Sequence, residues 1–180
     1  MEAKKLENYS YEDYLQIDKT TKERVELIFG KIYMMAGASA KHQDVVLNIA
    51  MLIKALNKCK PRVAPYDLKL ICDFGGKDSI NIVQPDIMIF CEDRDTPCAI
   101  FEVLSPSTAQ KDKKEKFSLY ECSGIEEYYI VEPEYRSVEK FILDNGSYKF
   151  GGNYVLSDKM FIECIGQEVE IEKFFEGIEE

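Results

Sequence analysis

The sequence lacks several features that would assign it to a familiar class at once. It contains no tryptophan and a single histidine, His42, so one chain cannot supply a multi-histidine metal site. No stretch approaches about 18 consecutive apolar residues, which excludes a transmembrane helix. The lysines Lys4 and Lys5 have no apolar run behind them, so we expect no signal peptide and a cytoplasmic protein.

Basic residues are also scarce. Lys plus Arg total 23 against 33 Asp plus Glu, which gives a net charge of −10. This balance argues against a general electrostatic binder of nucleic acid or membranes, although a local basic patch remains compatible with it. Hydrophobic residues make up 46% and charged residues 31% of the 180 positions, which is typical of a globular chain. This length predicts a single domain over residues 1–180.

The cysteines form no C-x-x-C pair. In a chain that is not exported we expect all of them to be thiols, and small buried core residues are a better interpretation than zinc ligands. The six positions are Cys59, Cys72, Cys91, Cys98, Cys122 and Cys164.

Local signals predict a chain that alternates between helices and strands. Ser10 can cap a helix that reaches Ile17, and a glycine turn at Gly30 indicates a β-hairpin. Ser39 can begin a second helix with one apolar face, which we expect Pro61 to stop.

The centre of the chain predicts a buried sheet. The apolar runs Ile87–Cys91 and Cys98–Leu104 are typical of strands buried on both faces. Ser107 and Gln110 predict a capped helix to about Cys122, followed by a strand at Tyr128–Val131. Asn145-Gly146 predicts a further hairpin.

Two carboxylates stand out in this buried region. Asp86 begins one of the strands and Glu102 interrupts the next. A carboxylate buried without a partner is costly, so a metal, a cation or a hydrogen-bond network must compensate Glu102. If the two strands pair, the carboxylates converge at one edge, where they suit Mg²⁺ or Mn²⁺ together with a carbonyl and waters.

The following helix adds three polar residues. Asp112, Lys116 and Tyr120 are four residues apart and share one helix face, from which Lys116 can point back at the carboxylates. Glu26 is a third carboxylate in an apolar strand, Val25–Ile28.

Each of these residues also has a structural interpretation. Asp86 can be a capping carboxylate, and Glu102 can form a buried ion pair with Lys116 in the absence of any metal. Glu26 can be part of a salt bridge, and His42 can be a surface or capping residue. A group of lysines can hold phosphate or form a solvated helix face: Lys111, Lys113, Lys114 and Lys116.

The order of these motifs resembles one family. The motifs are Val25–Gly30, His42, Gln84-Pro85-Asp86, Glu102–Thr108, Asp112 with Lys116, and Gly124–Val131. Together they resemble the Uma-type restriction endonuclease family of bacteria, which belongs to the PD-(D/E)XK nuclease superfamily. The resemblance extends from about Tyr9 to Phe175, so the nuclease-like core is expected over residues 9–175.

The resemblance implies an α/β fold with a restriction endonuclease-like core, in which helices flank a mixed central β-sheet with additional hairpins. It also implies a homodimer that hydrolyses phosphodiester bonds in DNA with Mg²⁺ or Mn²⁺. Asp86 and Glu102 match the metal-binding motif residues. Leu104 occupies the position of the motif lysine, and Lys116 is its expected substitute on the helix.

Other site roles follow from the same resemblance. Glu26 is expected to assist catalysis through water, and His42, Asp112 and Tyr120 are possible accessory residues. Two rival functions remain open: a catalytically degenerate nuclease fold used for binding or assembly, and a phosphohydrolase of small substrates.

Overall fold

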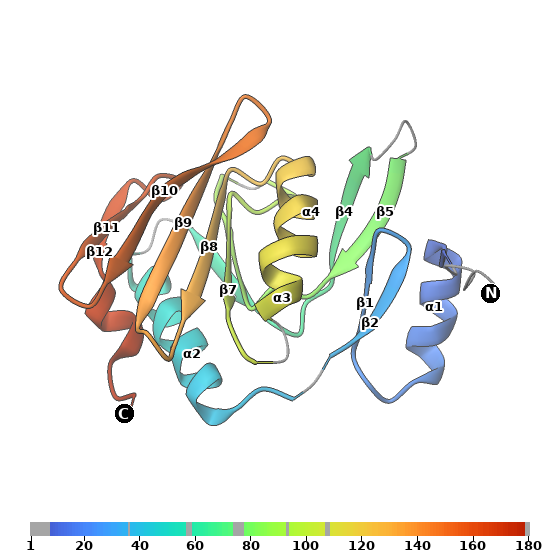
Figure 1. Cartoon of the computed structure of the whole chain (residues 1–180), viewed down its shortest axis with the longest axis horizontal. Coiled ribbons are helices and arrows are strands. Elements are labelled where there is room, and N and C mark those ends of the chain that lie inside the picture. The colour runs from blue at the N-terminus through green and yellow to red at the C-terminus, as the bar shows by residue number, and fades with distance from the viewer. Residues whose placement is uncertain are drawn as a thin grey trace, which may run out of the picture. The chain divides into compact units, whose positions relative to one another are not determined.

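The computed structural model describes residues 8–35, 37–56, 59–73, 78–92, 94–106 and 109–178 (Figure 1). The chain divides into two compact units. One comprises Met1–Gly37 and Asp67–Gln84, and the other comprises Ala38–Tyr66 and Pro85–Glu180. The single domain expected over residues 1–180 stays a prediction. In the described part of the chain, no helix has the length and apolar character needed to cross a membrane.

The first unit is a small antiparallel sheet with one helix. Its four strands lie in the order β2-β1-β5-β4. The elements are α1 (Tyr11–Thr20), β1 (Val25–Ile28), β2 (Lys31–Met34), β4 (Leu68–Asp73) and β5 (Asp78–Val83). The side chain of Ser10 accepts a hydrogen bond from the Asp13 N–H, and the Asp13 carboxylate accepts one from the Ser10 N–H. The predicted helix start and the hairpin around Gly30 are therefore confirmed.

The second unit is built on a six-stranded sheet in the order β10-β9-β8-β7-β6-β3. Strands β7 and β8 are parallel and their neighbours pair antiparallel, which confirms the predicted mixed sheet. The strands are β3 (Lys60–Val63), β6 (Ile87–Phe90), β7 (Ala99–Val103), β8 (Glu127–Glu132), β9 (Ser137–Asp144) and β10 (Ser147–Val155). The remaining elements are α2 (Ala40–Ala55), α3 (Ala109–Lys111), η1 (Asp112–Lys116), α4 (Phe117–Cys122), β11 (Lys159–Ile162), β12 (Gln167–Glu170) and η2 (Ile171–Phe175).

Helices cover both faces of this sheet (Figure 1). On the α2 face, Phe101 stacks on Tyr129 and meets Phe174 of η2. On the α4 face, Tyr128 contacts Tyr120. Because successive side chains of a strand point to opposite faces, Glu102 lies on the α4 face, between two residues of the α2 core.

The helices differ in two places from the prediction. Helix α2 ends at Ala55, well before Pro61, which instead lies inside β3 opposite Ile89. Pro61 therefore does not end the helix. The expected helix start at Ser107 lies outside the described residues. From Ala109 onwards the helix is interrupted by η1, a π-helical turn of a type that is frequent at functional sites.

The prediction that all six cysteines are thiols is wrong for four of them, because Cys59, Cys72, Cys91 and Cys122 are disulfide-bonded. Cys59 and Cys91 form a disulfide, with Cα atoms 4.6 Å apart. Their proximity follows from the pairing of β3 with β6, in which Lys60 lies opposite Phe90. The thiol prediction was based on the expected cytoplasmic location. It did not take into account which strands are neighbours in the sheet. Cys98 and Cys164 are free thiols.

Candidate active site

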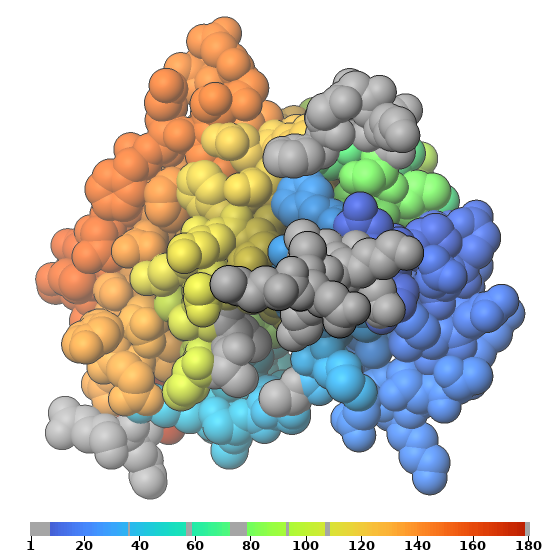
Figure 2. Space-filling view, turned by 45° about the vertical axis from the view of Figure 1, so that its right-hand side comes forward, coloured from blue at the N-terminus to red at the C-terminus, as the bar shows by residue number. Residues whose placement is uncertain are grey.

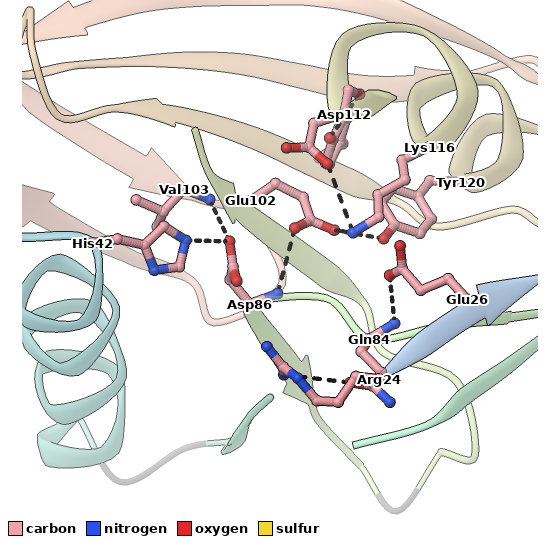
Figure 3. Close-up of polar contacts among 11 residues, drawn as sticks. Arg24, Glu26, His42, Gln84, Asp86, Glu102, Val103, Asp112, Lys116 and Tyr120 are labelled. Carbon is pink, nitrogen blue, oxygen red and sulfur yellow. Dashed lines mark hydrogen bonds and ion pairs between the residues drawn. The ribbon is translucent and has the colours of Figure 1, made fainter. Parts of the chain in front are cut away.

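The two carboxylates lie on neighbouring strands of the second unit (Figure 3). Strands β6 and β7 are antiparallel with Ile87 opposite Phe101, and this register places Asp86 opposite Glu102. The Asp86 N–H donates to Glu102 Oε2 over 3.4 Å, and the Val103 N–H donates to Asp86 Oδ2 over 2.8 Å. The predicted convergence of Asp86 and Glu102 is therefore present.

A lysine compensates the buried glutamate. Lys116 Nζ lies 2.8 Å from Glu102 Oε1 and 3.6 Å from Asp112 Oδ1. The Tyr120 hydroxyl donates to the same Glu102 oxygen over 2.7 Å. The side chains of Glu102, Asp112 and Lys116 are each at most 3% exposed, so these charges interact with little screening by solvent. The spacing of four residues thus brings Asp112, Lys116 and Tyr120 to one place, as expected from a shared helix face.

The other lysines of this segment face outward. Lys113 and Lys114 are exposed, and Lys113 lies 3.8 Å from Glu139 of β9. Figure 2 shows the outer side of this helical segment in yellow, next to the orange strands β9 and β10. Lys116 therefore differs from its neighbours, because it alone of these three turns its amine into the buried carboxylates.

The single histidine belongs to the same cluster. His42 lies in the first turn of α2, where its N–H donates to the capping Ser39 hydroxyl. Its Nε2 is 3.1 Å from Asp86 Oδ2. Burial lowers the pKa of His42, but the hydrogen bond and the negative charge of Asp86 outweigh burial, and the pKa is raised overall. His42 thus orients one oxygen of Asp86 and balances its charge.

A tyrosine that the sequence analysis did not assign to the site supports it from behind. Tyr128 of β8 donates its hydroxyl to the backbone carbonyl of Asp112 over 3.0 Å. Burial, and then the charges of Glu102 and Asp112, raise the pKa of Tyr128 well above its usual value, so it stays a hydrogen-bond donor. The hydroxyl of a buried tyrosine usually has a hydrogen-bond partner. This rule was the one signal in the sequence that could have assigned Tyr128 to the site.

Two further predicted residues, Glu26 and Leu104, are both buried. Glu26 lies in β1 of the first unit, is fully buried, and accepts a hydrogen bond from the Gln84 N–H over 2.9 Å. Its catalytic role stays a prediction. Leu104, in the position of the motif lysine, is buried and lines a pocket of about 280 Å³ whose wall also includes His42, Ser105 and Pro106.

The donor set suits a hard divalent cation. Asp86 Oδ2 accepts hydrogen bonds from Val103 and interacts with His42, whereas Asp86 Oδ1 accepts none from the described residues. The Glu102 oxygen that faces Asp86 is the one that neither Lys116 nor Tyr120 contacts. Mg²⁺ and Mn²⁺ prefer oxygen ligands, and Mg²⁺ commonly takes one or two carboxylates and keeps several waters. Asp86 and Glu102 therefore fit such an ion.

The fold recurs in a solved structure. A crystal structure described as "a putative nuclease belonging to DUF820" from Anabaena variabilis superposes with a TM-score of 0.69. The superposition covers 92% of this chain and 97% of that chain, at 16% sequence identity. The two proteins share the nuclease-like α/β fold.

The sequence comparisons identify the family. Two uncharacterised Synechocystis proteins are similar along nearly their whole length. The protein slr1290 is 27% identical over 179 residues, which cover 94% of this chain and 92% of the relative. The protein sll1609 is 28% identical over 177 residues, which cover 91% of each. A family model named Uma2 and described as "Putative restriction endonuclease" matches residues 11–161. The chain therefore belongs to the Uma2 family, as its motif order predicts.

Proposed function

We propose that this protein is a divalent-metal-dependent endonuclease that hydrolyses phosphodiester bonds in DNA. The observation that carries the proposal is the pairing of Asp86 with Glu102 across β6 and β7, with Lys116 on the second carboxylate. Asp86 and Glu102 would hold Mg²⁺ or Mn²⁺. Such an ion supplies Lewis acidity and lowers the pKa of a bound water.

The chain's own residues prepare this chemistry. The Val103 N–H and His42 fix one oxygen of Asp86, which leaves the other directed away from these partners. Lys116 and Tyr120 fix one oxygen of Glu102 in the same way. The buried ammonium of Lys116 can orient the attacking water or stabilise the negative charge that develops on the phosphate. The exposed Lys113 and Lys114 supply positive charge that a nucleic acid backbone would meet on η1.

Titration of Mn²⁺ by calorimetry tests the metal site directly. We expect the wild-type protein to bind Mn²⁺ and Glu102→Ala to lose more than about 100-fold in affinity. Loss of a residue that only supports a metal ligand typically costs about 10- to 100-fold, and this change removes a ligand itself. Glu168→Gln is the matched control, since Glu168 is an exposed carboxylate on β12. Wild-type protein that binds no Mn²⁺, with or without a DNA oligonucleotide present, would contradict the proposal.

A positioning role for His42 gives a second prediction. His42→Ala removes the partner of Asp86 Oδ2, so we expect Mn²⁺ affinity to fall about 10- to 100-fold while the protein stays folded. Lys41→Ala is the control, because Lys41 is the preceding residue of α2 and pairs with Glu134 instead. Equal affinities of the two variants in the same calorimetric titration would show that His42 has no influence on the site.

Two observations favour a second function. The direct contact of Lys116 with Glu102 is also what a catalytically degenerate nuclease fold would contain, and the net charge of −10 opposes binding to a polyanion. In that case the protein would serve binding or assembly and would show no metal-dependent turnover. Cleavage of a small phosphodiester without cleavage of plasmid DNA would instead indicate a small-molecule phosphohydrolase. The homodimer implied by the family resemblance can be measured in the same preparations by sedimentation.

A further inference from the structure

Four of the six cysteines gather at one end of the six-stranded sheet, where Cys91 and Cys98 lie at the opposite ends of β6 and β7 from Asp86 and Glu102. They come from four segments: Cys59 before β3, Cys91 after β6, Cys98 before β7 and Cys164 between β11 and β12. Cys59 is bonded to Cys91, and Cys98 Sγ is 3.3 Å from Cys91 Sγ. The sulfurs of Cys91, Cys98 and Cys164 all lie within 4.8 Å of one another.

These separations fit a single tetrahedral ion. Zinc bound by four thiolates has Zn–S distances of about 2.3 Å, which corresponds to sulfurs roughly 3.8 Å apart. Three of the sulfurs lie within 4.8 Å of one another, about 1 Å from this separation at most, and the fourth, that of Cys59, is bonded to one of them. We propose that, once the Cys59–Cys91 disulfide is reduced, Cys59, Cys91, Cys98 and Cys164 bind one Zn²⁺ as a structural site. This inference is independent of the proposed nuclease function.

The surroundings of the cluster are those of a closed structural site. Cys98 is 2% and Cys91 is 9% exposed, and both belong to the main hydrophobic core. Structural zinc sites are four-coordinate and buried in this way, without an open position for substrate. Four sulfur ligands also select zinc over Mg²⁺ and Mn²⁺, which prefer oxygen. The two metal sites of this chain would therefore not compete for the same ion.

A buried carboxylate holds Cys164 in place. Glu127 of β8 accepts hydrogen bonds from the N–H groups of Cys164 and Glu163, over 2.6 Å and 3.0 Å. Tyr129 donates to the same carboxylate from two residues along the strand. These bonds fix the turn between β11 and β12 against the sheet, so Cys164 reaches the other sulfurs although it is distant in sequence. Such support behind a ligand is a recurrent feature of metal sites.

The cluster is also accessible on one side. A pocket of about 430 Å³ is lined by Cys59 together with Arg62, Tyr66 and Phe90. It offers an entry path for a metal ion and for a thiol reductant. Reduction transfers two electrons and two protons from two thiol groups of the reductant to the disulfide, which yields the Cys59 and Cys91 thiols and an oxidised reductant. Zinc binding then displaces the protons of the four thiols.

Metal content provides the test. Protein reduced with a phosphine, loaded with Zn²⁺ and passed through a desalting column under anaerobic conditions should retain one zinc per chain. Cys98→Ser and Cys164→Ser should lose most of that zinc, whereas Glu168→Gln, which changes an exposed carboxylate on β12, should retain it. Glu102→Ala should also retain it, which separates this site from the carboxylate site. Equal zinc contents in wild type, Cys98→Ser and Cys164→Ser would overturn the proposal.

A measurement on the wild type avoids dependence on variants that fail to fold. Reduced protein loaded with Co²⁺ should show thiolate-to-metal charge-transfer bands and the intense visible bands of tetrahedral cobalt. The same protein with its disulfide intact should show neither, because two of the four ligands are then unavailable. A Co²⁺ spectrum without thiolate bands in the reduced protein would overturn the proposal, because the four reduced cysteines would then not bind the metal.

Discussion

Asp86→Asn is expected to reduce metal-dependent cleavage of DNA by about 1,000-fold without unfolding the protein. Asparagine keeps the size of the side chain and can still accept hydrogen bonds from the Val103 N–H and from His42. It lacks the negative charge that would hold the cation. A metal contributes several kcal/mol of charge stabilisation in the transition state, and about 4 kcal/mol corresponds to that factor.

The assay compares initial rates of plasmid nicking in Mg²⁺ and in Mn²⁺, with Glu168→Gln as the surface-carboxylate control. Circular dichroism and a thermal melt of each variant establish that the fold is intact. We expect Glu102→Gln to lose activity to a similar extent. Cleavage by Asp86→Asn at the wild-type rate would remove Asp86 from the metal-binding set, and a metal-independent rate in all variants would indicate a contaminating nuclease.

Much of the fold could be predicted because its signals are local. The capping box at Ser10 and the turn around Gly30 each depend on a few neighbouring residues, and the structure confirms both. The apolar runs of β6 and β7 also show their burial in the sequence itself. The π-turn of η1 was not predicted, because no residue type marks the shift of the helical hydrogen bonds.

In the candidate site, too, the features encoded by neighbouring residues were predicted and those that depend on distant contacts were not. Glu102 was conspicuous as a charged residue inside an apolar run, and the helical spacing located Lys116 near it. The contact of His42 with Asp86 depends on where α2 packs against the sheet, and nothing near His42 in the sequence encodes this. The four-cysteine cluster was missed for a related reason. Its members are brought together by strand pairing and by one distant turn, so no compact spacing pattern exists.

Lys116→Met is the change with the largest expected effect on stability. It leaves the carboxylates of Glu102 and Asp112 buried without their cation, which typically costs about 3–5 kcal/mol in the free energy of unfolding. Adding Glu102→Gln should recover part of this loss, because the buried negative charge is removed as well. Urea denaturation of the two single variants and the double variant gives the interaction energy of the pair. Additive effects would mean that Lys116 and Glu102 do not interact in solution.

Mn²⁺ binding by Lys116→Met then distinguishes the two proposed functions. The two functions predict different effects of Lys116 on the binding of the metal. In a nuclease, the wild type binds Mn²⁺, and loss of the nearby positive charge should leave the affinity equal or higher while cleavage falls. In a degenerate fold, Lys116 occupies the place of the cation, so the wild type should not bind Mn²⁺ and Lys116→Met should gain binding. A variant that binds Mn²⁺ and also cleaves DNA at the wild-type rate would remove Lys116 from catalysis. The contact of 2.8 Å between Lys116 and Glu102 is common to both functions, so the response of the metal to its removal decides between them.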